Sequence, residues 1–223
     1  ATLVQKNTLE PLDAYISTAG IDLAKFGGIT NQVTVDGKLY ELPFRSDFWL
    51  IFYNKDVFDK KGVPYPTNDM TFEQYDALAR KVADTTFGAE VYGAHYHTWR
   101  SAVQLFGVLD GKNSILSGEY SFFAPYYNMV LSQMKDGIAM LYTDISTQSL
   151  HYSAAFTGGN VAMLNMGSWF ISTMINNLKK GDYDKELCGN WGLVKYPHAE
   201  GVPAGSTLGT ITGLSVTSAS KQK

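Results

Sequence analysis

One long apolar segment constrains the fold of this chain more than any other. Residues 41–66, ELPFRSDFWLIFYNKDVFDKKGVPYP, read as a buried strand that turns at a polar Tyr-Asn-Lys-Asp step into a short helix. The strand carries two charged residues, Arg45 and Asp47. Burying an unpaired carboxylate costs on the order of several kcal/mol, so we expect Asp47 to face water or a ligand. An ion pair with Arg45 is the alternative.

Strand-like and helix-like segments alternate after this point. Thr71 and Gln74 form a capping box, which predicts the start of an amphipathic helix. The periodicity further predicts helices over 98–109 and around 126–134, a strand over 161–166, a helix from Gly167-Ser168 to Gly181, a strand over 191–194 and a loop over 195–206. This alternation is typical of an α/β fold.

The helix expected after Gly167 and Ser168 follows its strand without a linker. Its first backbone N–H groups are free, and the positive end of its dipole points beyond the carboxyl end of the strand. Open α/β sheets bind ligands at that edge, so we expect Gly167 and Ser168 to lie at a ligand site. Helical spacing also predicts an inward face made of Ile171, Met174, Ile175 and Leu178.

Composition and charge exclude several classes of function. The 223 residues carry a net charge of -3, with a pI of about 5.8, so nucleic acid and anionic membrane surfaces are not expected partners. A single cysteine, Cys188, excludes an internal disulfide and every multi-cysteine metal site. No run of 18 apolar residues is present, so no span of a bilayer is expected.

Catalytic and metal-binding motifs are absent from the sequence. Ser218 to Lys221 matches S-x-x-K, but this match lies in a polar tail and is typical of chance. His95 and His97 could share one face of a strand, yet no neighbouring carboxylate or thiol completes a coordination shell. We therefore expect no metal, no cofactor and no enzymatic activity.

Aromatic residues make up 13% of the chain and give the positive signal. Trp49, Trp99 and Trp169 fall at the boundaries of expected elements, and Tyr96 lies close to Trp99. An aromatic face packs against the C–H face of a sugar, while carboxylates, amides and arginine bind the hydroxyls. Each tryptophan alone is also compatible with a core position. Together with Arg45 and Asp47 they predict a carbohydrate site.

The stretch around the opening strand resembles the extracellular solute-binding proteins of ABC sugar importers, the family that includes maltose-binding protein. The matching positions are Gly37-Lys38-Leu39-Tyr40, Pro43, Tyr53-Asn54-Lys55-Asp56, Gly62, Pro64-Tyr65-Pro66 and Thr71. A second block matches at Phe156, Gly158, Ala162-Met163 and Gly167-Ser168-Trp169, and a weaker third at Tyr196-Pro197 with 205–213. The resemblance covers essentially the whole chain but only the middle of such a protein.

The resemblance implies a type II periplasmic-binding-protein fold in three parts. Residues 1–43 would be the tail of the first lobe, 44–206 the second lobe, and 207–223 the return strand toward the first lobe. It places Asp47, Tyr96, Trp99 and Trp169 at ligand-contacting positions, with Trp169 as the stacking residue. No signal segment is expected within these residues.

The implied function is binding without catalysis. A mono- or oligosaccharide would bind in the cleft between two lobes, and the closed protein would be presented to an ABC permease. The expected location is extracytoplasmic, as a bacterial periplasmic protein or surface lipoprotein. Two alternatives stay open. One is a carbohydrate-active enzyme such as a glycoside hydrolase, and the other is a structural or receptor module with no small ligand.

Overall fold

The computed structural model describes residues 2–83 and 91–223, which form two compact units. The smaller unit combines the chain up to Asp47 with Gly209–Lys223, and the larger unit is Phe48–Leu208. The expected lobe boundaries at 43/44 and 206/207 stay predictions. None of the described helices is long and apolar enough to cross a membrane.

The smaller unit is built around a small apolar core of Leu12, Ile16 and Leu39. The backbone N–H of Leu39 donates to Asp13 Oδ2 at 3.1 Å, and the N–H of Leu12 donates to the Leu39 carbonyl at 2.7 Å. Its elements are α1 (Thr2–Gln5), α2 (Asp13–Thr18), β1 (Thr34–Val35), β2 (Lys38–Leu39), β7 (Gly209–Leu214) and 3-10 turns at Leu23–Phe26 and Ile29–Val33.

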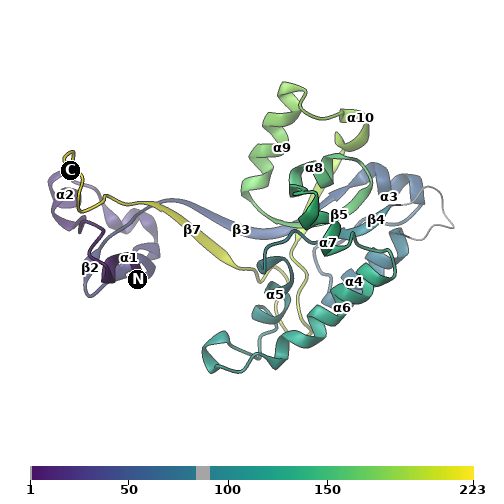
Figure 1. The fold of residues 1–223 in the computed structure, drawn as a ribbon, viewed down its shortest axis with the longest axis horizontal. Helices are drawn as coiled ribbons and strands as arrows, with labels where there is room; N and C mark the ends of the chain where they lie inside the picture. Colours follow the sequence, from purple (N-terminus) through teal and green to yellow (C-terminus); the bar gives the residue numbers. More distant parts are fainter. Residues whose placement is uncertain (1, 84–90) are drawn as a thin grey trace. The chain divides into compact units, whose positions relative to one another are not determined.

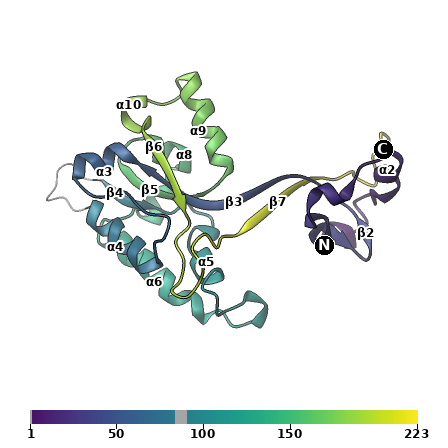
Figure 2. The same ribbon diagram turned by 180° about the vertical axis from the view of Figure 1, so that it is seen from behind.

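The larger unit is organised on a mixed sheet (Figures 1 and 2). Its strands are β3 (Leu42–Asn54), which begins in the smaller unit, β4 (Tyr92–His95), β5 (Val161–Gly167) and β6 (Trp191–Lys195). They lie in the order β4-β5-β3-β6, and β7 also pairs with β3. β4 and β5 are parallel, whereas β3 is antiparallel to both β5 and β6. The predicted strands at 161–166 and 191–194 are confirmed.

Helices flank this sheet on both sides. Figure 1 shows α4 (Phe72–Val82), α5 (Ser101–Val108) and α6 (Ala124–Lys135) below it, and α8 (Tyr152–Thr157), α9 (Trp169–Lys180) and α10 (Lys185–Cys188) above it. The remaining elements are α3 (Lys55–Lys61), α7 (Tyr142–Thr147) and 3-10 turns at Ile115–Ser117 and Ser121–Phe123. The α/β fold predicted from the sequence is therefore confirmed.

Local signals in the sequence account for where the helices begin and end. Asn54 caps α3 through its side chain, and Gly62 ends that helix in the left-handed conformation at φ 63°. The predicted capping box of α4 is present, with Thr71 Oγ1 accepting from Gln74 N and Gln74 Oε1 accepting from Thr71 N. Gly181 ends α9 as expected.

The inward face of α9 differs from the one expected from its periodicity. Phe170 and Met174 are fully buried and Ile171 packs against the core, but Ile175 and Leu178 are 42% and 37% exposed. The buried face of α9 runs through Phe170 and Met174. It is therefore rotated about the helix axis away from Ile175 and Leu178, which were expected to point inward. The inward assignment of Ile175 and Leu178 was wrong.

The capping box gives a first prediction. Replacing Thr71 by alanine leaves an orphan N–H at the first turn of α4, and we expect the free energy of unfolding to fall by about 1 kcal/mol. Thr71→Ser keeps the hydroxyl and is the matched control. Urea unfolding followed by circular dichroism measures both variants, and equal stability of Thr71→Ala and wild type would contradict the role of the cap.

The buried histidine of β4 gives a prediction about pH. The His95 side chain is fully buried, and neither ring nitrogen has a hydrogen-bond partner among the described residues. Burial, with a smaller contribution from neighbouring His97, lowers the pKa of His95 to about 4. In the unfolded chain a histidine has a pKa near 6.5, so the unfolded state binds the additional proton between these two values.

His95 should therefore leave the free energy of unfolding unchanged above about pH 6.5. As the pH falls toward 4, this group should lower the free energy of unfolding by up to about 3 kcal/mol. Urea unfolding at pH 7.5, 6.0 and 5.0 measures the effect in wild type and in His95→Gln, which has no titrating ring. The advantage of wild type over the variant should shrink with acidification. A constant difference across the three pH values would rule out this contribution.

Candidate functional site

The ladder between β3 and β5 positions three of the expected ligand residues. Trp49 lies opposite Gly167 in this antiparallel pair. The pairing continues into the next residue, where Phe48 N donates to Ser168 Oγ at 3.2 Å and Ser168 N donates to the Phe48 carbonyl at 2.8 Å. The Ser168 hydroxyl makes no capping hydrogen bond to α9 and accepts from the neighbouring strand. It therefore fixes the start of α9 to β3.

Gly167 is required by the close approach of an indole ring. A Cβ atom placed on Gly167 would lie 2.0 Å from the Trp169 ring, which folds back over the last residue of β5. No larger residue fits without moving that ring. Gly167 therefore determines the position of Trp169, which is the residue expected to stack on a sugar.

Trp169 is the centre of a cluster of rings, all within the larger unit. We call this set the ring cluster: Trp49, His97, Trp99, His151, Tyr152 and Trp169. Trp49 packs edge-on against Trp169 with centroids 5.5 Å apart, and Trp99 lies 6.1 Å from Trp169. Trp169 Nε1 donates to the Tyr152 hydroxyl at 3.3 Å. The structure therefore brings the three predicted tryptophans together, although they are far apart in the sequence.

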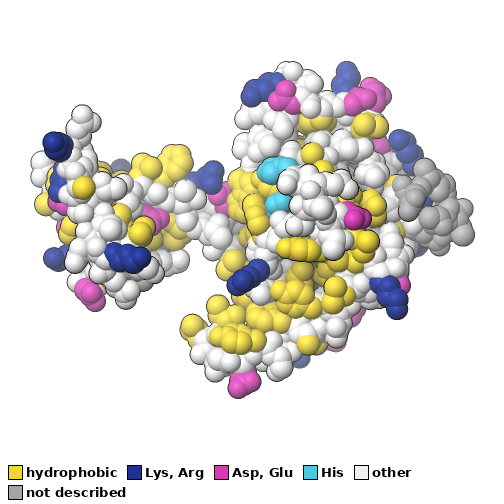
Figure 3. Space-filling model, viewed as in Figure 1, with side chains coloured by type: hydrophobic (Ala, Val, Ile, Leu, Met, Phe, Trp, Pro, Cys, Tyr) yellow, Lys and Arg dark blue, Asp and Glu magenta, His cyan; other side chains and the backbone are white. Residues whose placement is uncertain are grey.

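The rings of the cluster differ in exposure. Trp49 and Tyr152 are buried at 4% and 7%, Trp169 and His97 are half-buried, and Trp99 is 42% exposed. The buried rings support the others, since the ring contacts within the cluster are all edge-on or tilted. Figure 3 shows histidine side chains beside hydrophobic ones on this face of the larger unit. The arrangement leaves aromatic surface open to a ligand.

Two histidines of the cluster were not found from the sequence. The His97 ring lies 4.8 Å from Trp99 and 6.0 Å from His151, and His151 lies 4.0 Å from Tyr152. Burial lowers the pKa of His97, and His151 lowers it further. From the sequence, His97 was expected only as a possible metal partner of His95. Its closeness to Trp99 was the available signal, and no local pattern marks His151.

Tyr96 lies in the core rather than in the ring cluster. It is 2% exposed and its hydroxyl donates to Gln133 Oε1 at 2.9 Å. Burial raises its pKa well above the usual value. Successive residues of an extended chain point to opposite sides, so His97 reaches the cluster where Tyr96 was expected.

Arg45 and Asp47 form an ion pair with Nε and Oδ2 2.7 Å apart. Asp47 is 4% exposed, whereas Arg45 is exposed and its guanidinium also reaches Thr212 Oγ1 at 3.4 Å. Both residues belong to the part of β3 in the smaller unit. The pairing considered as the alternative is thus present, and a ligand-binding role for either residue stays a prediction.

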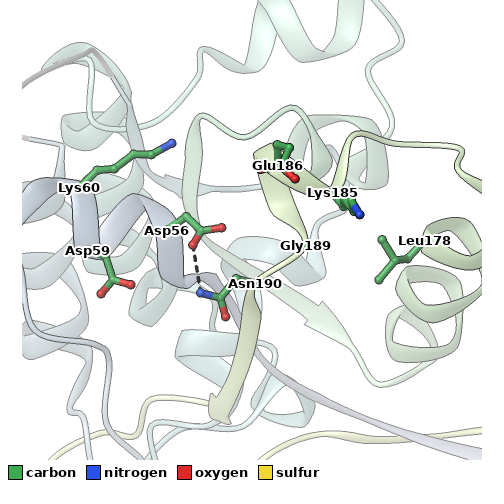
Figure 4. A pocket seen from close by; sticks show the side chains of 8 residues that line it. All are labelled: Asp56, Asp59, Lys60, Leu178, Lys185, Glu186, Gly189 and Asn190. Carbon is green, nitrogen blue, oxygen red and sulfur yellow. Dashed lines mark hydrogen bonds between the residues drawn. The ribbon is translucent and has the colours of Figure 1, made fainter.

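A separate hollow of about 790 Å³ lies near α3, the helix that follows the C-terminal end of β3 (Figure 4). It is lined by Asp56, Asp59, Lys60, Leu178, Lys185, Glu186, Gly189 and Asn190. Asn190 Nδ2 donates to Asp56 Oδ1 at 3.0 Å across it. Its lining has mixed charges and no aromatic ring, so it does not offer the stacking surface that the ring cluster has. The described residues contain no group of three or more His, Cys, Asp or Glu that could hold a metal ion.

Comparison with solved structures shows the fold of this chain in sugar-binding proteins. A sugar transporter from Rhizobium etli in an open conformation is 47% identical, with a TM-score of 0.79, over 99% of this chain and 56% of its own. A substrate-binding protein of Listeria monocytogenes in complex with cycloalternan has a TM-score of 0.77 at 21% identity, over 98% of this chain and 54% of its own. The type II periplasmic-binding-protein fold expected from the sequence is confirmed.

Sequence comparisons give the same relationship. A Brucella abortus (strain 2308) protein classed as a binding protein is 33% identical over 92 residues, which are 40% of this chain and 21% of that protein. The chain thus spans about half the length of the solved relatives, and the segment matched in the Brucella protein is about a fifth of that protein. The family model for bacterial extracellular solute-binding proteins matches residues 1–223. The chain belongs to the family of bacterial extracellular solute-binding proteins.

Proposed function

We propose that this chain is part of the extracytoplasmic solute-binding component of an ABC importer, that it binds a carbohydrate, and that it catalyses no reaction. The observation that carries this proposal is the ring cluster, in which Trp99 and Trp169 offer aromatic surface beside polar imidazoles. The 47% identity with a sugar transporter supports the same ligand class. The partner would be the membrane permease of the importer.

A glycoside hydrolase is the rival function, because it also combines aromatic rings with carboxylates. A retaining enzyme needs two carboxyl groups about 5–5.5 Å apart on either side of the scissile bond. The ring cluster is made of tryptophan, tyrosine and histidine, and Asp47, the acid expected at the site, is paired with Arg45. The proposal is therefore binding, and nitrophenyl glycosides incubated with the protein should release no nitrophenol.

The direct test is titration calorimetry on the protein at its natural full length with a panel of sugars. The panel includes D-mannitol, α-D-tagatose, mannobiose, maltose and cycloalternan. We expect at least one sugar to bind with a micromolar Kd and to raise the melting temperature. If no member binds and none raises the melting temperature, the proposal fails.

A tryptophan substitution tests the role of the ring cluster. Trp99 is 42% exposed and its loss removes a stacking surface, so Trp99→Ala should weaken the binding of the sugar found in that panel by roughly tenfold. Tyr65 is a matched control because it is also an aromatic residue, is 39% exposed, and packs on Tyr53 and Phe58 outside the cluster. Tyr65→Ala should bind like wild type. Equal affinities for both variants would argue against stacking on Trp99.

A glycine substitution tests how Trp169 is positioned. Gly167→Ala would place a methyl group against the Trp169 indole, so we expect a changed near-ultraviolet circular dichroism spectrum and at least tenfold weaker sugar binding. Gly209 is the control, since a Cβ atom there meets nothing within 4 Å. An unchanged spectrum and affinity in Gly167→Ala would show that the ring does not depend on this glycine.

A further inference from the structure

The ring cluster contains two histidines, His97 and His151. Histidine is the side chain type that most often changes charge near neutral pH. The two residues come from different elements, since His97 follows β4 and His151 precedes α8. Their rings lie 6.0 Å apart, and both touch Tyr152, at 5.2 Å and 4.0 Å. The His97 ring thus lies beside Trp99, and both imidazoles pack on Tyr152, whose hydroxyl accepts from Trp169 Nε1.

The hydrogen bond made by His151 defines the tautomer of its neutral ring. His151 is the N-cap of α8, and its Nδ1 accepts from the backbone N–H of Ser153 at 3.3 Å. Only an unprotonated Nδ1 can accept this bond, so the proton of the neutral ring is on Nε2. A second proton would remove the cap and place a positive charge at the positive end of a helix. His151 is exposed, so its Nε2–H is a donor held in a fixed direction.

His97 is half-buried, and its Nδ1 is enclosed with no hydrogen-bond partner among the described residues. The ionisable groups that interact with it are His95 on the same segment and His151 and Tyr152 from the start of α8, and Arg100 follows it three residues later in the sequence. None of these is an acid, so no carboxylate in this set would compensate a charge on His97. Protonation of both imidazoles would place two positive charges side by side.

We propose that His97 and His151 are the polar part of the carbohydrate-binding face, that they hydrogen-bond ligand hydroxyls as neutral imidazoles, and that ligand binding therefore weakens on acidification. This inference rests on the proposed function of the same site. The hydroxyl-binding role then belongs to two residues that were not expected at the site from the sequence. The ligand class that fits is a neutral sugar or polyol, because neutral imidazoles donate and accept without requiring a charged partner.

The test uses the full-length protein and the sugar that binds most tightly in the calorimetric panel. Because burial lowers the pKa of His97, the dissociation constant of wild type should change little between pH 7.5 and pH 6.5 and rise roughly threefold or more as the pH falls further to 5.0. His97→Gln and His151→Asn should each bind about tenfold more weakly at pH 7.5, and the double variant should lose the pH dependence. Asparagine is chosen at position 151 because it preserves the N-cap of α8.

His198→Gln is the matched control, because His198 lies outside the cluster and its ring contacts Asp69 and the Ala199 carbonyl. It should keep both the affinity and the pH profile of wild type. If His97→Gln fails to fold by circular dichroism, His151→Asn and the wild-type pH profile decide the matter. Wild-type affinity and an unchanged pH profile in the histidine variants would overturn the inference and leave the proposed function intact. Absence of any binding by wild type would instead overturn the proposed function, and this inference with it.

Discussion

The antiparallel ladder between β3 and β5 is the constraint on which the candidate site depends. It sets Trp49 opposite Gly167, and this register brings Ser168 within hydrogen-bond distance of Phe48. A slip of one residue would turn every side chain of β3 to the other face and separate the two tryptophans. The chain between Gly167 and Trp169 is too short to compensate. The geometry of the ring cluster therefore depends on this backbone pairing.

Side-chain packing holds the Trp169 ring of this cluster in one orientation. Trp49 is almost fully buried, yet its edge supports the Trp169 ring, which is also held by its hydrogen bond to Tyr152. A ring held on two sides loses little conformational freedom when a ligand binds, so the entropic cost of association falls. In the proposed function, Trp49 would therefore contribute by holding the Trp169 ring in place rather than by touching the ligand.

The sequence predicted the elements well because their signals are local. The capping box of α4, the Gly181 stop of α9 and the apolar run of β5 each lie within a few residues. The site was predicted less completely. Trp99 and Trp169 were found by composition and by family resemblance, but Tyr96 lies in the core because alternation along the chain directs His97 to the cluster instead. His151 gave no signal, since its contact with His97 spans more than fifty residues and exists only in the folded chain.

The energetics of the cluster also limit what it can do alone. A micromolar complex requires about 8 kcal/mol, while an aromatic contact or a hydrogen bond to a neutral group contributes roughly 1 kcal/mol each. The open surface of Trp99 and Trp169 with two imidazole donors amounts to about half of that requirement. Under the proposed function, further contacts would have to come from residues outside the ring cluster; the chain spans 56% and 54% of the length of the two solved relatives. In the proposed function the ring cluster would therefore set the class of ligand, while the affinity would also depend on residues that the cluster does not contain.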